Sequence, residues 1–519
     1  MSASRILAID VGTQSARAIA FDAQGRLLAR AQKVFEPTYH SPQPGWAEQH
    51  ADSYWEAVLA CVHELWAGGE VKPADIAGLA VTTQRATTVC LDGGGHVLRP
   101  AILWLDQRRC DQPPAMGPLW DTLFFLAGAG GLIRHFQREA EANWLAQYQP
   151  ALWRETKKYL FLSGYLNFRL TGNYTDSAGS QVGYVPFDYK HLRWPHHGDW
   201  KWRAVAVRRD QLPALVAPGQ VMGHLSRIAA GELGLPPRLP VIAAAADKAC
   251  EVLGSGALAP DVAALSFGTT ATINTTQPRY LEVQRLLPAY PAALPAMWNT
   301  EVQIYRGFWM VSWFKREFAH REQALARERN VPVEALFDDL VRGVPPGSMG
   351  LTLQPYWSPG VRDPGPEAKG AIIGFGEAHT RAHLYRAIIE GLVYGLRAGK
   401  DQIERKTGVP IRRVVVAGGG SQSEVAMQVT ADVFGLAAER PEVYETSALG
   451  AAIDAAIGLG LHPDYPAAVA AMTRTGARFE PDRSAQRVYD QLYREVYAPL
   501  YPRLRPLYRR IRAITGYPP

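Results

Sequence analysis

Two acidic residues in this sequence are placed where a carboxylate can take part in chemistry. Asp10 ends the apolar run "RILAID" (5–10), and Asp247 ends the apolar run "LPVIAAAAD" (239–247). Two carboxylates that face one cleft can hold hydrated magnesium, and either can accept a proton from a substrate hydroxyl. An isolated Asp at such a position more often caps a turn or a helix, so neither residue is informative alone.

A glycine–threonine turn follows Asp10, and a similar turn occurs about 250 residues later. Glycine lets an anion approach backbone N–H groups closely, and hydroxyl side chains nearby can donate further hydrogen bonds. Arginine two residues past the turn can reach a phosphate. The predicted phosphate-binding residues are Gly12, Thr13, Gln14, Ser15 and Arg17 at the first turn, and Gly268, Thr269 and Thr270 at the second.

A third glycine-rich segment, "VVVAGGGSQSE" (414–424), lies between a predicted strand and a predicted helix. It lacks the GxGxxG spacing and the later acidic residue of a dinucleotide site, which disfavours an oxidoreductase. The sequence also has no GxxxxGK[ST] motif, so it predicts no P-loop. A flat glycine surface against adenine fits the segment better, and a tight strand–helix turn is the alternative.

The elements that must position these residues alternate between strands and helices. The opening predicts a three-stranded meander, followed by a helix over about 52–66. Residues 139–172 are predicted to be helical, and "SALGAAIDAAIGLG" (447–460) predicts a small-residue helix suited to close packing. Because 262–276 repeats the strand–turn–strand plan of the opening, the sequence predicts a duplicated α/β fold.

Composition limits the classes of protein to which this chain can belong. With 519 residues, 47% of them hydrophobic, two domains are expected. The net charge of +6 is small for this length, and the four dispersed cysteines predict neither a zinc site nor a disulfide scaffold. No apolar run approaches the roughly 20 residues of a membrane span. We therefore expect a cytoplasmic protein with no membrane partner.

Two further segments have an alternative interpretation. The basic, aromatic tail (482–519) can suggest nucleic acid, but a terminal amphipathic helix packed on the second domain is favoured. "HLRWPHHGDWKWR" (191–203) carries His196 and His197 among tryptophans. A metal there needs further ligands, so a surface loop or a contact near the substrate is predicted. No nucleic-acid partner is expected.

Taken together, the motifs resemble those of the FGGY carbohydrate kinases. "IDVGTQSARA" and "LSFGTTATIN" are similar to the two phosphate motifs of that family, and the segment from "VVVAGGG" to "AAIGLG" is similar to its adenosine region. "PGWAEQHADSYW", "TTQRATT", "AILWLDQRR" and "AAADKACEVLGSGAL" add to the resemblance, which spans about 5–460. It implies two duplicated ribonuclease H-like (actin/hexokinase-like ATPase) domains, 1–257 and 258–519, with ATP and sugar in the cleft between them.

The resemblance also implies roles for individual residues. Asp247 is expected to be the catalytic base, and Asp10 and Asp247 the carboxylates linked to Mg²⁺. ATP is the expected phosphoryl donor, and a small sugar or polyol the expected partner. The adenosine site is expected at Gly418, Gly419, Gly420 and Ser423, and the acceptor site at Gln84, Arg85, Trp104, Asp106 and Lys248.

The identity of the acceptor is where the family patterns diverge. "QRATT" has Ala86 where the glycerol kinase pattern has Glu, and Lys248 follows the base where that pattern has Gln. Losing a carboxylate that binds hydroxyls argues against glycerol. Asp106 resembles the xylulokinase pattern "LWND". A ketopentose such as xylulose is the leading expectation, and glycerol, another polyol or a sugar acid is the alternative.

Three questions stay open at the level of sequence. Arg85 and Lys248 together predict a cationic pocket that favours an acidic acceptor, unless Lys248 pairs with Asp106 or Asp10 or points to solvent. A nucleotide-gated sugar sensor without catalysis is an alternative of another class on the same fold. A homodimer is also compatible with the sequence.

Overall fold

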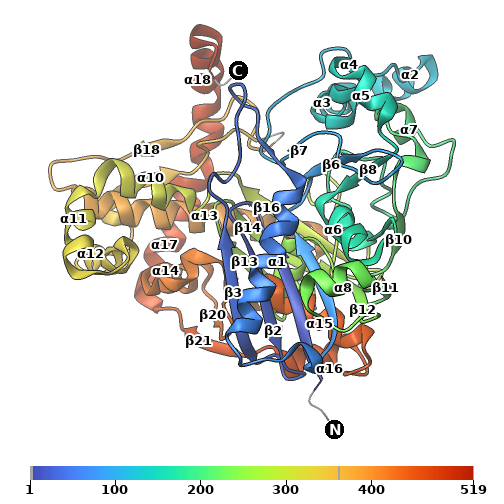
Figure 1. Ribbon diagram of the computed structural model, residues 1–519. Coiled ribbons are helices and arrows are strands. Elements are labelled where there is room, and N and C mark those ends of the chain that lie inside the picture. The colour runs from blue at the N-terminus through green and yellow to red at the C-terminus, as the bar shows by residue number, and fades with distance from the viewer. Residues whose placement is uncertain (1–3, 361–362, 518–519) are drawn as a thin grey trace. The chain divides into compact units, whose positions relative to one another are not determined.

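The computed structural model describes residues 4–360 and 363–517, which form two compact units (Figure 1). Unit 1 comprises residues 1–256, 277–299 and 445–473, and unit 2 comprises 257–276, 300–444 and 474–519. Two later segments of the chain thus belong to unit 1. The division into family-type domains at residue 257 stays a prediction.

Unit 1 is built on a six-stranded sheet with the order β11-β12-β5-β1-β2-β3. β1 pairs antiparallel with β2 and parallel with β5, and β5 pairs parallel with β12. The predicted opening meander is confirmed, because β2 also pairs antiparallel with β3. The strands are β1 (Arg5–Val11), β2 (Ser15–Phe21), β3 (Leu27–Val34), β5 (Ile76–Thr83), β11 (Val221–His224) and β12 (Pro240–Ala243).

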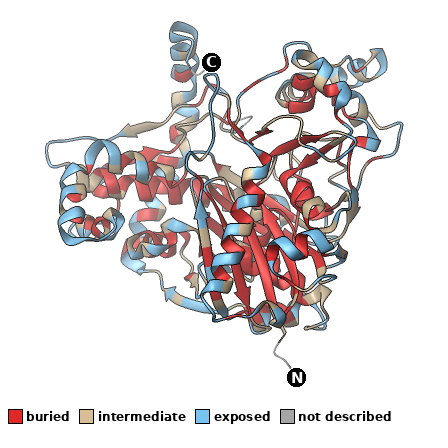
Figure 2. Ribbon diagram, viewed as in Figure 1, coloured by how far each residue is buried: buried red, intermediate tan, exposed pale blue. Residues whose placement is uncertain are grey.

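Burial explains why these segments form a central sheet. Six of the seven residues of β1 are buried, as expected of a strand that is covered on both faces. α1 (Ala51–Ala67) presents Tyr54, Val58, Cys61 and Leu65 to this sheet at helical spacing. Figure 2 shows the result: buried strands, with the outer face of α1 exposed.

Unit 2 repeats this topology in six strands of a seven-stranded sheet, in the order β16-β14-β13-β19-β20-β21. β13 pairs antiparallel with β14 and parallel with β19, and β19 pairs parallel with β20, which matches β1, β2, β5 and β12 of unit 1. The predicted duplication of an α/β fold is confirmed. The strands are β13 (Val262–Phe267), β14 (Ala271–Gln277), β16 (Trp298–Ile304), β19 (Arg413–Ala417), β20 (Ala438–Pro441) and β21 (Thr475–Phe479).

The remaining elements cover or connect these sheets. In unit 1 the helices are α2 (Pro118–Leu126), α3 (Gly130–Glu139), α4 (Glu141–Tyr148), α5 (Pro150–Glu155), α6 (Leu162–Thr171), α7 (Lys201–Ala204), α8 (Arg227–Leu233), α9 (Asp247–Gly254), α15 (Thr446–Gly458) and α16 (Tyr465–Met472). In unit 2 they are α10 (Trp309–Phe318), α11 (His320–Arg329), α12 (Phe337–Val341), α13 (Arg381–Thr407), α14 (Glu424–Phe434), α17 (Arg483–Leu492) and α18 (Ala498–Thr515). Short strands are β4 (Glu48–Gln49), β6 (Thr88–Leu91), β7 (Ala101–Ile102), β8 (Lys158–Phe161), β9 (Thr175–Ser177), β10 (Ala214–Val216), β15 (Tyr290–Pro291), β17 (Thr352–Gln354) and β18 (Ala371–Ile373).

Helices α9 and α15 of unit 1 cross at very short range. A Cβ on Gly254 would lie 2.0 Å from the carbonyl oxygen of Thr446, and one on Gly450 would lie 2.0 Å from that of Cys250. Only glycine permits such a crossing. The close packing predicted for the small-residue helix is confirmed.

One predicted helical stretch is interrupted by a strand. Residues 158–161 form β8, which pairs antiparallel with β6 over Thr88–Leu91. The sequence "KYLF" is rich in β-favouring aromatic residues, and pairing with β6 buries three of its four side chains. The expectation of helix throughout 139–172 is therefore wrong at this point.

The tail forms helix in unit 2 as predicted. α18 continues through Pro502 and Pro506, and Tyr508 and Tyr501 anchor it. Gln354 donates to the Tyr508 hydroxyl over 2.9 Å, and the Tyr501 hydroxyl donates to Glu367 over 2.9 Å. Among the residues described, no helix combines the length and apolar character needed to cross a bilayer.

Candidate functional site

Asp10 lies in β1 as a buried carboxylate with an arginine across the strand pair. The β1–β2 register sets Arg17 opposite Asp10, and Arg17 Nη1 donates to Asp10 Oδ2 over 2.9 Å. Burial raises the pKa of Asp10 to about 6; the Arg17 cation opposes this rise, and the negative charges of Asp247 and Glu445 add to it. Because Asp247 acts on the titration of Asp10, the two predicted carboxylates share one local electrostatic environment.

Asp247 does not end a strand, contrary to the sequence prediction. The β12–β5 pairing ends at Ala243, and Asp247 is the first residue of α9. Its Oδ1 accepts a hydrogen bond from the Lys248 backbone N–H over 2.7 Å. Burial raises the pKa of Asp247, the Lys248 and Arg85 cations lower it, and the Glu251 anion raises it. The carboxyl group is thus more basic than an exposed Asp.

One partner of Lys248 is a residue that the sequence analysis did not consider. Lys248 Nζ donates to Glu251 Oε2 over 2.7 Å, one turn along α9. The alternatives in which Lys248 pairs with Asp106 or Asp10 are replaced by this i,i+3 pair, because the first turn of α9 brings the two side chains together. The Lys248 charge is consequently balanced by a neighbouring carboxylate.

Arg85 of the acceptor set lies against an aromatic residue from a distant segment. Its guanidinium is 5.1 Å from the ring centroid of Tyr290, which belongs to the 277–299 segment of unit 1. This is within the range of a cation–π contact. Arg85 also acts on the titration of Asp247 and Lys248, so the three groups form one cluster.

A chain of hydrogen bonds joins the first turn to the acceptor residues. Trp104 Nε1 donates to Thr13 Oγ1 over 2.9 Å, and Thr13 Oγ1 donates to Gln84 Oε1 over 2.7 Å. Gln84 Nε2 in turn donates to the hydroxyl of buried Tyr54 over 3.2 Å. Since a hydroxyl has one hydrogen and Thr13 Oγ1 gives it to Gln84, this hydroxyl has none to donate to a phosphate oxygen.

Asp106 is enclosed by other protein groups. Its Oδ1 accepts from the Arg108 backbone N–H and Nε, both over 2.8 Å, and its Oδ2 accepts from the Ala47 N–H over 2.6 Å. The side chain is 3% exposed. These hydrogen bonds stabilise the turn that carries Trp104. The Trp104 residue is 44% exposed. Contact of Asp106 with the acceptor stays a prediction. Its hydrogen bonds favour a role in stabilising the turn that carries Trp104.

The first turn offers backbone donors at its tip. Gly12 N–H donates to Ser15 O over 3.0 Å, and Ser15 Oγ accepts from Gln32. Within the described chain, the N–H groups of Thr13 and Gln14 meet no protein acceptor. Two adjacent backbone N–H groups of this kind suit an anionic oxygen.

The second turn, in unit 2, is stabilised by hydrogen bonds with residues 305–308, a segment that the motif does not include. The carbonyl groups of Gly268 and Thr269 accept from the Phe308 and Gly307 N–H groups over 3.0 and 2.8 Å. A Cβ on Gly307 would lie 2.1 Å from the Ala271 nitrogen. Thr270 Oγ1 donates to Tyr305 O over 3.3 Å. Residues 305–308 therefore fix the turn through its carbonyl side.

The glycine run packs against this same segment. Gly418 has φ +84°, and its Cβ would lie 2.9 Å from the Phe267 carbonyl carbon. A Cβ on Gly420 would lie 2.3 Å from Phe308, whose ring stacks on Phe267 at 4.3 Å. Unit 2 thus brings the predicted phosphate turn and the predicted adenosine glycines together around two phenylalanines.

Ser423 and Gly419 have different surroundings. Ser423 caps α14 by accepting from Ala426 N–H, and its hydroxyl donates to Asp338 Oδ1 over 2.5 Å. Gly419 has open surroundings, because the nearest neighbour of a Cβ at this position would be the Tyr444 hydroxyl, 3.5 Å away. A direct contact of either residue with adenosine stays a prediction.

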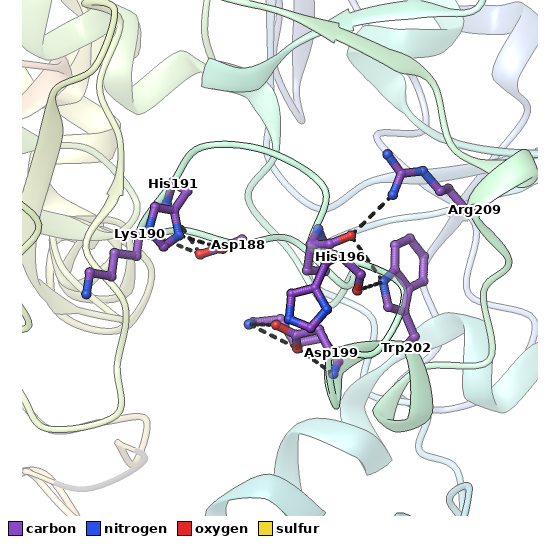
Figure 3. Close-up of polar contacts among 9 residues, drawn as sticks. Asp188, Lys190, His191, His196, Asp199, Trp202 and Arg209 are labelled. Atoms are coloured by element: carbon purple, nitrogen blue, oxygen red, sulfur yellow. Dashed lines mark hydrogen bonds and ion pairs between the residues drawn. The ribbon is translucent and has the colours of Figure 1, made fainter.

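The histidine-rich loop makes polar contacts both within itself and with neighbouring segments, such as the hydrogen bond that Arg209 Nη1 donates to the Pro195 carbonyl over 3.3 Å (Figure 3). His191 Nδ1 lies 2.7 Å from Asp188 Oδ2, and the His196 carbonyl accepts from Trp202 Nε1 over 3.0 Å. His196 and His197 are both exposed. In the described residues, no group of three His, Cys, Asp or Glu side chains is arranged to hold a metal ion. The loop is an exposed surface segment, as one of the two predictions stated.

Comparisons with known proteins cover most of the chain. The profile of the FGGY family of carbohydrate kinases matches residues 5–254 with its N-terminal domain and 263–459 with its C-terminal domain. The uncharacterized sugar kinase YgcE of Escherichia coli K12 is 28% identical over 515 residues, which is 96% of this chain and 94% of the relative. A glycerol kinase of Geobacter sp. M21 is 28% identical over 488 residues, covering 92% and 94%. The crystal structure of xylulose kinase from Rhodospirillum rubrum has a TM-score of 0.80 and 26% identity, covering 97% of this chain and 100% of that one.

Proposed function

The chain belongs to the FGGY family of carbohydrate kinases, and from this premise we propose that it transfers the γ-phosphoryl group of ATP to a hydroxyl of a small sugar or polyol, with Asp247 as the general base. The observation that carries the proposal is the environment of Asp247. It is a half-buried carboxyl at the start of α9, with its pKa raised and with Arg85 and Lys248 beside it. A base that must accept a hydroxyl proton near neutral pH benefits from this elevation.

The other residues divide the remaining tasks. The tip N–H groups of Thr13 and Gln14 and the turn at Gly268–Thr270 would receive phosphate oxygens, and Gly418–Gly420 would receive adenosine. Catalysis of phosphoryl transfer depends mainly on such positioning and on charge neutralisation. Asp247 would accept the proton of the attacking hydroxyl as the bond to phosphorus forms.

Asp10 and Asp247 fit a magnesium ion. They are oxygen donors, and the charge of Asp247 raises the pKa of Asp10. Mg²⁺ is usually bound by one or two carboxylates together with substrate phosphates and water. When bound, the ion would neutralise phosphate charge. Arg17 holds Asp10 from the opposite strand, so this carboxylate is oriented before any ligand arrives.

The acceptor class is proposed to be a neutral sugar, with a ketopentose such as xylulose first. Arg85 and Lys248 are offset by Asp247 and Glu251, so the cluster has no excess positive charge to attract a sugar acid. Ala86 provides no carboxylate for a polyol at the position that follows Arg85. The similarity to a xylulose kinase and a glycerol kinase keeps both classes in the test panel.

A coupled ADP-release assay over xylulose, ribulose, glycerol and gluconate tests the proposal. We expect stimulation by a neutral ketose, and Asp247→Asn should lower kcat by about 10²–10⁴-fold, because it removes the base. ATP affinity should be retained, and Asp210→Asn, at an exposed position, is the matched control. Near-normal turnover of Asp247→Asn would exclude it as the base. ATP binding without stimulation by any acceptor would favour the sugar sensor.

A further inference from the structure

Glu445 is a buried carboxylate to which the sequence motifs assign no role. It is 7% exposed, it immediately precedes α15, and it is the first residue of the 445–473 segment of unit 1. A buried charge of this kind is costly unless other charges compensate it. The positively charged groups around Glu445 therefore indicate its role.

Two arginines from the opening meander of unit 1, Arg17 in β2 and Arg30 in β3, lie beside Glu445. Arg30 Nε lies 2.9 Å from Glu445 Oε1, and Arg17 Nε lies 3.5 Å from Glu445 Oε2. Arg17 also donates through Nη1 to Asp10 over 2.9 Å. The guanidinium of Arg17 is therefore held between two carboxylates, one from β1 and one from the start of α15.

This arrangement determines the orientation of Arg17. A guanidinium is planar and carries its charge over a rigid fork, so a hydrogen bond at Nη1 and an ion pair on the Nε side together restrain its position. The Nη1 contact with Asp10 holds one edge of the guanidinium. Glu445 supplies the second contact, and Arg30 offsets the charge that Glu445 brings.

We propose that Glu445 is a positioning residue for phosphoryl transfer: it orients Arg17, and through Arg17 it orients Asp10, on the phosphate side of the site. This inference rests on the proposed function for the identity of the ligand, ATP. Glu445 acts through Arg17, so it touches neither ATP nor the acceptor.

The test compares Glu445→Gln with the wild-type full chain. The substitution keeps the shape of the side chain and removes its charge. We expect kcat/KM for ATP to fall by about 10–100-fold, as is typical when a partner of a ligand-binding side chain is lost. The KM for the acceptor should change less than about twofold. Glu322→Gln is the matched control, because it removes an equally buried carboxylate charge paired with Arg381 over 2.7 Å in unit 2.

A double-mutant cycle with Arg17→Met separates positioning from a general structural role. If Glu445 acts through Arg17, Glu445→Gln should have little further effect in the Arg17→Met background. The cycle is read out both by kcat/KM and by calorimetric titration with a non-hydrolysable ATP analogue, with and without Mg²⁺. Full effects of Glu445→Gln in the Arg17→Met background would overturn the proposal, as would wild-type nucleotide affinity and turnover in Glu445→Gln.

Two further results keep the test decisive. Should Glu445→Gln fold poorly, Glu445→Asp keeps the charge and withdraws it by one methylene, and the same cycle applies. Should the wild type phosphorylate no acceptor, the proposed function fails. The calorimetric cycle on nucleotide affinity still decides the role of Glu445 in that case.

Discussion

The neighbouring glycines 419 and 420 allow a sharp test of the proposed adenosine site. Their sequence context does not distinguish them, but the structure does. A Cβ on Gly420 would lie 2.3 Å from Phe308 Cδ1, whereas one on Gly419 would lie no closer than 3.5 Å to any atom. Gly420→Ala and Gly419→Ala are thus a matched pair with different expected results.

The magnitude follows from the packing of Phe308. Its ring is 8% exposed and is stacked on Phe267 at 4.3 Å, so it cannot yield to a new methyl group without losing that contact. Overpacking of this kind costs about 1–3 kcal/mol. For a domain of about 150–250 residues, each kcal/mol lowers Tm by about 2–4 °C, so Gly420→Ala should lower it by about 2–12 °C. Gly419→Ala should stay within about 0.5 kcal/mol of wild type.

Thermal and urea denaturation measure the loss of stability, and titration with ATP measures the change in nucleotide affinity. If Gly419 lines the adenosine site, Gly419→Ala should weaken ATP binding several-fold while leaving Tm unchanged. A Gly420→Ala variant as stable as wild type would refute the packing argument. Equal destabilisation by the two substitutions would refute it as well.

Two other predictions concern the acceptor side. The Lys248 cation lowers the pKa of Asp247, and the Glu251 anion raises it. Lys248→Met should therefore move the acidic limb of the pH profile of kcat/KM to higher pH. Glu251→Gln should move the same limb to lower pH. Shifts in the same direction, or no shift, would contradict this assignment. Thr13→Val removes the hydroxyl that joins two predicted acceptor residues through two hydrogen bonds. At about 0.5–1.5 kcal/mol for each bond, it should raise the acceptor KM by about 5–160-fold. The Kd for ATP, measured in the same preparation, should be unchanged.

Local patterns were sufficient to predict much of the framework. An apolar run, a glycine turn and a second apolar run form a hairpin through short-range contacts, so Asp10 and Arg17 could be placed on facing strands from sequence. The same argument predicted the second hairpin at Gly268. Its repetition indicated the duplicated fold, which the two sheets confirm.

Contacts between distant segments could not be predicted in this way. Tyr290 has no motif around it, and it meets Arg85 only because 277–299 belongs to unit 1. Gly307 supports the second turn from a segment that follows another strand. Such contacts depend on the tertiary fold, which leaves no periodic signal in the chain.

Asp106 shows a different limit. An acidic residue two positions after Trp104 was grouped with the acceptor residues, because a motif does not reveal which side chain turns inward. The arginine two residues later was the available signal: Arg108 can reach back to Asp106 around a tight turn, and in the structure it does. A carboxylate with a nearby arginine on the same turn is more often internally paired than a ligand contact.

The duplicated topology also gives Glu445 a structural counterpart in Asp247. α9 follows β12, the strand next to β5, and α15 follows β20, the strand next to β19, which corresponds to β5. Asp247 opens the first of these helices and Glu445 precedes the second, so each copy of the fold has an acidic residue at the same junction. Their surroundings differ: Asp247 has an elevated pKa, which suits a base, whereas Glu445 is paired with two arginines, which suits an anchor. These two topologically equivalent junctions would thus have different roles: Asp247 would act as the base, and Glu445 would orient the phosphate-side arginine.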